Sequence, residues 1–309
     1  MRIFSRTIRM SLSRTAAFLA AGFLLCAPLC TADEGADQNL DAANLPSMAA
    51  DRSLGVLDTG FRDLYRLDFS GARAEFLSYQ RMQPEDPLGK AAEAASYLYE
   101  EFNAKGVFTS AFFLNDSKLL GGVDGSASEN RNDEFLGANH QAREMAKRRV
   151  DVDPRDVQGL LVLTLADGME SDYDALIVKK QVAALGLMRK AEDEAVRLLA
   201  IDSSAQDAYV ALGASNYIIG CMPGYKRLFL RIGGIHGDRA RGMQQMQIAA
   251  EHGRYLQPFA KILLALAFER EHQMERARAL LAELTHEFPE NPLFAHELAL
   301  TQLHAPIRN

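Results

Sequence analysis

The sequence predicts an all-α protein, and three observations support this fold class. Apolar residues in 53–305 recur at intervals of three and four, the spacing that places them along one face of a helix. No segment replaces this rhythm with the strict alternation of a half-buried strand. Alanine, leucine, glutamate and arginine are common and tryptophan is absent, a composition that favours helix. We therefore expect one helical domain over 53–305.

The first 32 residues are expected to be an export signal. The apolar run at 16–29 has the length of a signal-peptide core and is shorter than the roughly 20 residues of a membrane-spanning helix. Ala32 supplies a small residue directly before Asp33, so cleavage is predicted after Ala32, and the mature protein is expected to be periplasmic or secreted. The alternative is an uncleaved anchor, which would be the chain's one contact with a membrane. The preceding leader has no acidic residue, and its cations are Arg2, Arg6, Arg9 and Arg14.

Charge and cysteine content narrow the classes of partner. The chain has 34 basic against 41 acidic residues, and loss of the four leader arginines would leave 30 and a net charge of −11. Nucleic-acid phosphates would repel such a chain, so no nucleic-acid partner is expected. Cleavage would remove Cys26 and Cys30, each preceded by leucine, which disfavours a lipid anchor. The remaining Cys221 is expected to be a small buried side chain, with a reactive thiol as the alternative.

Residues 33–52 are polar, small and acidic, and we expect a flexible linker there, followed by the first helix from 53. Gly71 is expected to end that helix, and Pro84 to end the next one. The first helix is predicted from the spacing of Leu54, Leu57, Phe61, Leu64 and Tyr65, and the second from that of Ala72, Phe76 and Tyr79.

The clearest helix pair lies near the C-terminus. A polar turn from Glu271 to Gln273 separates two segments with apolar faces, and Pro289 ends the second. Two short amphipathic helices cannot bury both apolar faces alone, so they are expected to stack on further pairs. The first face consists of Phe259, Leu263, Leu266 and Ala267, and the second of Ala277, Leu280, Leu281, Leu284 and Phe288.

One spacing recurs four times: an alanine, an apolar residue four positions later, and an exit residue eight positions after that. Small residues let the two helices of a pair approach closely, and proline ends the second helix. The four sets are Ala72, Phe76 and Pro84; Ala142, Ala146 and Pro154; Ala191, Ala195 and Ser203; and Ala277, Leu281 and Pro289. Two further matches are Gly60, twelve positions before Ala72, and the segment from Tyr209 to Gly213, which starts six positions after Ser203.

These residues resemble the tetratricopeptide repeat, whose second helix carries alanine, a large apolar residue and an exit proline. The chain looks most like the divergent members of this family that bacteria export. The resemblance implies a right-handed solenoid of antiparallel helix pairs, and it implies no activity. The exits are 70, 49 and 86 residues apart rather than multiples of about 34, so the array is expected to carry insertions.

The stretch 115–136 fits the repeat worst, and we expect a loop insertion there. Its early part is rich in asparagine, aspartate, serine and glycine, which is typical of an exposed loop. The segment from Asp124 to Asn130 lacks the turn glycine and the closing glutamate of a calcium-binding EF-hand loop. No metal site is therefore expected.

The segment from Asn216 to Gly242 combines unusual residue types and supplies the candidate binding residues. Five cations fall between Lys226 and Arg241, beside two tyrosines and a glycine-rich turn that opens a helix at Asp238. Helix N-termini and arginines both favour anions, so one interpretation is a site for an anionic group. The other is a structural turn with left-handed glycines and locally paired cations. The candidate ligand- or partner-binding residues are Asn216, Tyr217, Tyr225, Lys226, Arg231, Arg239 and Arg241.

The sequence favours a non-catalytic protein over an enzyme. It contains no Walker phosphate loop, no G-x-S-x-G elbow and no H-E-x-x-H helix, and we expect no catalytic residue and no cofactor. The expected function is a scaffold that binds a protein or peptide partner in the cell envelope through the concave face of the solenoid. The alternative is a small-molecule binder for an anionic ligand, such as a solute-handling component. A large enclosed cavity flanked by Tyr217 and Lys226 would favour the alternative, and an open groove lined by scattered polar residues the scaffold.

Overall fold

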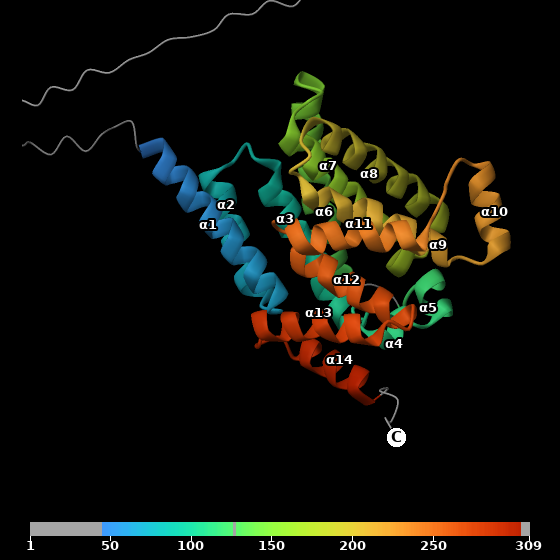
Figure 1. Ribbon diagram of the computed structural model, residues 1–309. Coiled ribbons are helices and arrows are strands. Elements are labelled where there is room, and N and C mark those ends of the chain that lie inside the picture. Colours follow the sequence, from blue (N-terminus) through green and yellow to red (C-terminus); the bar gives the residue numbers. More distant parts are fainter. Residues whose placement is uncertain (1–44, 126–127, 304–309) are drawn as a thin grey trace, which may run out of the picture. The chain divides into compact units, whose positions relative to one another are not determined.

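The computed structural model describes residues 45–125 and 128–303, which consist of helices joined by turns (Figure 1). No strand occurs within these ranges, which confirms the all-α prediction. None of the helices described there is long and apolar enough to cross a membrane. The predicted signal peptide and linker residues 33–44 lie outside the described residues.

The α-helices are α1 (Leu45–Tyr65), α2 (Phe69–Met82), α3 (Pro87–Ala104), α4 (Ser110–Phe113), α5 (Asp116–Gly121), α6 (Glu129–Val152), α7 (Val157–Tyr173), α8 (Gln181–Ile201), α9 (Tyr209–Cys221), α10 (Gly224–Ile232), α11 (Arg239–His252), α12 (Gln257–Arg270), α13 (Met274–Glu287) and α14 (Pro292–Leu303). A π-helical turn, η1 (Asp174–Val178), follows α7, and a 3-10 turn, η2 (Gln206–Ala208), precedes α9.

The first helix begins earlier than the sequence suggested. It starts at Leu45, so residues 45–52 are helical and the predicted linker and domain boundary at 53 are wrong there. Proline is tolerated in the first turn of a helix, where Pro46 stands. The residues that follow, Met48 to Ala50, are good helix formers, so the helix can begin before residue 53.

Consecutive helices stack in antiparallel pairs, which confirms the predicted architecture. The pairs are α1 with α2, α3 with α6, α7 with α8, α9 with α11, and α12 with α13, and α14 packs on the last pair. Helices α4 and α5 are inserted between the two helices of the second pair, and α10 is inserted between those of the fourth. These insertions explain why the exits are spaced irregularly.

Small residues stand where the helices of a pair meet. Ala72, Ala142, Ala191 and Ala277, one from each recurring set, are at most 2% exposed. Gly60 on α1 shows how close the approach is, because a methyl group added there would lie 2.5 Å from an atom of the Phe76 ring on α2. The buried positions predicted from the repeat spacing are confirmed.

The repeat spacing missed one pair, α9 with α11. The second helix of this pair carries Gly242 where the other sets carry alanine, and Met246 follows four positions later. A methyl group on Gly242 would lie 2.6 Å from the backbone nitrogen of Tyr217 and 2.7 Å from the carbonyl oxygen of Gly213. The backbones of the two helices touch, so alanine does not fit and an alanine-based pattern passes over this pair.

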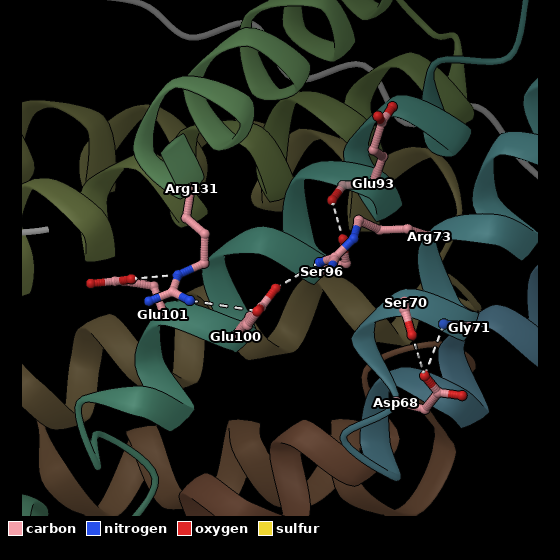
Figure 2. Close-up of polar contacts among 9 residues, drawn as sticks. All are labelled: Asp68, Ser70, Gly71, Arg73, Glu93, Ser96, Glu100, Glu101 and Arg131. Atoms are coloured by element: carbon pink, nitrogen blue, oxygen red, sulfur yellow. Dashed lines mark hydrogen bonds and ion pairs between the residues drawn. The ribbon is translucent and has the colours of Figure 1, made fainter. Parts of the chain in front are cut away.

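The break between α1 and α2 precedes Gly71, and the prediction that Gly71 ends the first helix is wrong. The chain turns at Leu67, whose φ of 67° is left-handed. Asp68 then caps α2: one carboxylate oxygen accepts hydrogen bonds from the Gly71 N–H and the Ser70 hydroxyl, each at 2.9 Å (Figure 2). Gly71 lies in the first turn of α2. Glycine suits this position because a methyl group there would collide with the capping carboxylate of Asp68.

The predicted loop at 115–136 is instead largely helical, and this prediction is wrong. Helix α5 begins after Asn115, whose side-chain oxygen accepts the Lys118 N–H at 3.1 Å. Val123 is buried after α5, and its N–H donates to the carbonyl of Leu176 at 2.8 Å. Polar residues that favour loops also favour helix caps, so composition alone did not distinguish the two.

Ion pairs join α2, α3 and α6. Arg73 on α2 contacts Glu100 on α3 at 2.8 Å. Arg131 on α6 contacts the same Glu100 at 3.5 Å and the neighbouring Glu101 at 2.8 Å (Figure 2). Glu101 is buried, so its charge requires this partner.

The array curves back on itself, so that the first and fifth pairs meet. The Tyr65 hydroxyl at the end of α1 donates to the carbonyl of Tyr255, and the Asn291 amide donates to the carbonyl of Tyr65, both at 2.8 Å. The rings of Phe61 and Tyr255 stack with centroids 4.8 Å apart. This closure places the inner faces of the pairs around a shared interior.

Candidate functional site

The interior between the helix pairs contains a cavity of about 520 Å³. Its wall includes residues from all five pairs: α1, α3, α7, α8, α9 and α12, together with the inserted helices α4, α5 and α10. Pockets that bind small molecules commonly measure about 300–1,000 Å³. The cavity is therefore of ligand size.

Apolar side chains form most of the wall. They come from the apolar faces of amphipathic helices, which point into the interior. In a more closely packed array these faces would contact one another. Aromatic rings are prominent among them, and they offer large, rigid contact surfaces to a ligand. The aromatic lining residues include Phe61, Tyr65, Tyr99, Phe102, Phe108, Phe112, Phe113 and Phe259.

The cavity exists because small residues occupy inward positions where a packed core would have large ones. Protein interiors normally leave few voids larger than a water molecule. Gly168 on α7 shows the space directly, because a methyl group added there would meet no atom within 4 Å. The small lining residues include Ala91, Ala92, Ala95, Gly168, Ala175, Ala184, Ala191, Ala211 and Ala214.

Several polar groups on the wall are satisfied within the protein. The Asp207 carboxylate accepts the N–H groups of Tyr255 at 3.1 Å and Leu256 at 3.0 Å. The Ser171 hydroxyl donates to the carbonyl of Ala184 at 2.9 Å. These groups have a structural role and need no ligand.

Asp172, near the end of α7, is different. Its side chain is exposed, and it lines the cavity on the same face of the helix as Leu165 and Met169. Burial raises its pKa to about 7, and no neighbouring charge contributes to the shift. Asp167 on the same helix contrasts with it, because Arg143 contacts that carboxylate at 2.7 Å. Within the described residues Asp172 has no such partner.

The Tyr99 hydroxyl is a second polar group on the wall. The rings of Tyr99 and Tyr65 lie with centroids 6.0 Å apart, but the Tyr65 hydroxyl donates to a backbone carbonyl instead. The hydroxyl of Tyr99 neighbours that of Tyr65, and its oxygen remains able to accept a further hydrogen bond. Burial raises the pKa of Tyr99 well above its usual range, and the neighbouring Tyr65 hydroxyl and then the charge of Asp172 add to the shift. The phenol is therefore a neutral donor and acceptor close to Asp172.

The cavity reaches the protein surface beside α10. Tyr225 and Phe229 on this helix line the cavity while remaining 64% and 72% exposed. Figure 1 shows α10 set apart from the stacked helices, between the ends of α9 and α11. Its end is held by Arg189, which donates to the carbonyl of Gly233 at 3.0 Å. Helix α10 therefore stands at the mouth of the cavity.

The seven predicted binding residues do not form one site. Tyr225 and Lys226 line the cavity mouth on α10. Arg239 does not line the cavity but contacts Glu271 at 3.0 Å, the same carboxylate that the Tyr217 hydroxyl contacts. Arg231 and Arg241 are exposed, and their side chains form no ion pair within the described residues. Their contact with an anionic partner stays a prediction.

Tyr217 and Asn216 take up structural positions. The Tyr217 ring is 1% exposed and stacks on Phe113, and its hydroxyl donates to Glu271 at 3.2 Å. The Asn216 amide donates to the side-chain oxygen of Gln245 at 2.9 Å, which joins α9 to α11. Neither residue lines the cavity, so the cavity is flanked by Lys226 but not by Tyr217.

The glycines and the cysteine of the same segment also have structural explanations. Gly234 has a left-handed φ of 79°. A methyl group on Gly237 would lie 2.5 Å from Ile219. Cys221 is half-buried and burial raises the pKa of its thiol, which disfavours the reactive thiolate. This favours the structural interpretation of the turn.

Comparisons with known proteins give one structural similarity. No protein-family model matches this chain, and no curated protein matches it in sequence. Among solved structures, the chain is similar to a thermophilic tetratricopeptide-repeat protein from Thermus thermophilus. The identity is 15% and the TM-score 0.44, over 81% of this chain and 99% of that chain.

Sequence reasoning missed Asp172 and Tyr99. The signal for Asp172 was present, because it follows Leu165 and Met169 at helical spacing and therefore lies on the apolar face of α7. An acid on such a face, without a basic residue one turn away, indicates a polar group directed into an apolar interior. Tyr99 gave no sequence signal, since a tyrosine on an apolar face is ordinary.

Proposed function

We propose that this chain is a non-catalytic binding protein that holds an apolar small molecule in its central cavity. The single observation that supports this proposal is a ligand-sized, mainly apolar cavity of about 520 Å³ lined by residues of all five helix pairs. Burial of apolar ligand surface contributes roughly 25 cal/mol per Å² before the costs of association. An empty apolar void contributes nothing comparable to stability, so selection for ligand binding explains why small residues line it.

Two sequence expectations differ from this proposal. An open groove lined by scattered polar residues would have favoured the peptide-binding scaffold, whereas the inner face of this array forms a mainly apolar cavity that opens beside α10. The alternative of an anionic ligand placed Tyr217 and Lys226 together, and only Lys226 borders the cavity. The proposal keeps the small-molecule class and changes the expected ligand from anionic to apolar.

A protein-binding scaffold is the second candidate, and α10 is the observation that favours it. This helix exposes Leu228, Phe229 and Ile232 by 59%, 72% and 78%. Exposed apolar side chains concentrated on one short helix often mark a contact surface. A protein segment bound to α10 would lie at the mouth of the cavity, because Phe229 also lines it.

Glycine substitution on α7 tests the cavity proposal with a matched control. Gly168→Phe would project a ring into open cavity space, whereas Gly186→Phe on α8 places the same ring at an exposed helix position outside the cavity. Binding of the neutral apolar dye Nile red would be followed by its fluorescence. We expect the wild type and Gly186→Phe to bind the dye and Gly168→Phe to lose most binding while remaining helical. Equal binding by all three proteins would refute the proposal.

We further propose that the protein acts outside the cytoplasm, in the cell envelope, after loss of its first 32 residues. The support is the sequence alone: a cationic leader, an apolar run and a small residue at Ala32. N-terminal sequencing of protein from the envelope fraction should find Asp33 as the first residue. An intact Met1 would support the uncleaved anchor instead.

A further inference from the structure

We infer that the ligand of the cavity is a lipophilic amine, whose cationic nitrogen binds between the Asp172 carboxylate and the Tyr99 hydroxyl. This inference rests on the proposed function, and it names the chemical class that the polar part of the wall selects. Its basis is the contrast between Asp172 and the other acids nearby.

A carboxylate in an apolar environment needs a partner, because loss of hydration penalises the charged form. Asp167 has Arg143 at 2.7 Å, and Asp207 has two backbone N–H groups. Asp172 has neither, although its carboxyl is directed into the same interior. Within the described residues the missing partner is therefore a cation or a hydrogen-bond donor from outside the chain.

The protein itself supplies no cation to this position. Lys226 is the one lysine or arginine among the described cavity-lining residues, and it is exposed on α10 at the mouth. No basic residue contributes to the pKa of Asp172, so none lies close enough to pair with it. A bound ammonium group would supply the charge that is lacking.

The remaining wall suits the rest of such a ligand. The Tyr99 hydroxyl oxygen can accept a second N–H of the amine while it neighbours the Tyr65 hydroxyl, and the rings of Tyr65 and Tyr99 can contact the cation through their faces. The alkyl or aryl part would lie against the aromatic and aliphatic side chains described above. A fatty acid would instead bring a second negative charge beside Asp172, and an alcohol would form a hydrogen bond without charge.

Three ligands with the same chain separate these possibilities: decylamine, decanol and decanoic acid, each below its micelle concentration. Their displacement of Nile red from the full-length protein would be measured at pH 8, where Asp172 is ionised. A charge-assisted hydrogen bond should make decylamine bind roughly 10- to 100-fold more tightly than decanol. Decanoate should bind more weakly than decanol.

Two variants and one control locate the preference. Asp172→Asn should bring the affinity for decylamine to that for decanol, and Tyr99→Phe should reduce the preference in part. Asp193→Asn removes the same charge from an exposed position on α8 and should change nothing. A preference for decylamine that survives Asp172→Asn, or equal binding of decylamine and decanol to the wild type, would overturn the inference.

The preference should also depend on pH. The other titratable groups on the described wall are Tyr65, Tyr99, Asp207, Tyr225 and Lys226. Burial also raises the pKa of Asp207, but backbone N–H groups counteract this by stabilising its carboxylate, whereas nothing counteracts the rise in the pKa of Asp172 to about 7. We therefore assign the expected pH dependence to Asp172. Decylamine should lose affinity as the pH falls from 8 to 5.5, because protonated Asp172 cannot pair with a cation. Decanol should be unaffected.

The outcomes distinguish the inference from the proposed function. If all three ligands displace the dye equally and Gly168→Phe abolishes dye binding, the cavity binds apolar molecules and the amine inference is wrong. If Gly168→Phe has no effect on the dye or on any of the three ligands, both are wrong.

Discussion

The C-terminal pair α12–α13 and the pair α9–α11 solve the same packing problem in two ways. At the first, Ala277 is completely buried, so a methyl group fills the contact between the helices. At the second, Gly213 and Gly242 let the two backbones touch, and no methyl group fits. The alanine spacing of the repeat was recognised in the first pair and overlooked in the second. A repeat is thus specified by the required closeness of its helices rather than by one residue type.

The two pairs also differ in what lies between their helices. A three-residue turn, Glu271 to Gln273, joins α12 to α13, and this pair was predicted nearly to the residue. Between α9 and α11 the chain instead runs out to α10 and returns through a glycine-rich turn. Touching backbones hold α9 and α11 together without help from the connection, which leaves α10 free to stand at the mouth of the cavity.

The largest effect is expected at the methyl-filled contact. Ala277→Phe would force a ring into a position that is 0% exposed, and overpacking of this kind costs about 1–3 kcal/mol, with larger losses where the backbone cannot shift. The melting temperature and the free energy of unfolding in urea would measure it. An unchanged melting temperature would show that α13 does not press on α12 at this residue.

Gly242→Ala should lower the stability of the protein by a smaller amount, although the same change usually stabilises a helix. Alanine normally stabilises a helix by about 1 kcal/mol relative to glycine, but here its methyl group would lie 2.6 Å from a backbone atom of α9. We expect a net destabilisation of about 1–2 kcal/mol. Gly186→Ala on α8, where a methyl group meets nothing within 4 Å, is the matched control and should be stabilising. If both variants were stabilised alike, the backbones of α9 and α11 would not be in contact.

The smallest effect on stability is expected from charge reversal in the segment around α10. Lys226 is exposed, and the contact between Arg239 and Glu271 is half-exposed, so such charges contribute about 0–1 kcal/mol. The double variant Lys226→Glu, Arg239→Glu should therefore unfold within about 1 kcal/mol of the wild type and bind Nile red equally well. Loss of dye binding would show that these cations contribute to the binding site.

The fold was largely predictable from sequence because its signals are local. Apolar spacing and the prolines at 84, 154 and 289 placed the helices, and the recurring alanines placed their contacts. The failures arose where one local signal had two meanings. Gly71 was interpreted as a helix end although it sits beside a cap, and Asn115 as a loop residue although it is a cap.

The site was predictable only in part because a cavity is a property of several helices at once. Individually, Ala91, Gly168 and Ala214 are ordinary helix residues, and only closure of the array gathers them around one space. The basic segment drew attention through its composition, yet the structure places just Tyr225 and Lys226 of the predicted set beside that space. Asp172 differs because its position on an apolar face could have been read from the sequence.

The central claim is that the cavity, rather than the outer surface, binds the ligand, and the methionine methyl groups test it directly. Met169, Met188 and Met222 line the cavity, while Met246 is buried at the contact between α9 and α11 and does not. Methyl NMR spectra of protein labelled with ¹³C at the methionine methyl groups would be recorded during titration with decylamine. The account predicts saturable shifts for the first three signals and a constant Met246 signal. Saturable binding that leaves the three cavity methionines unshifted would contradict it.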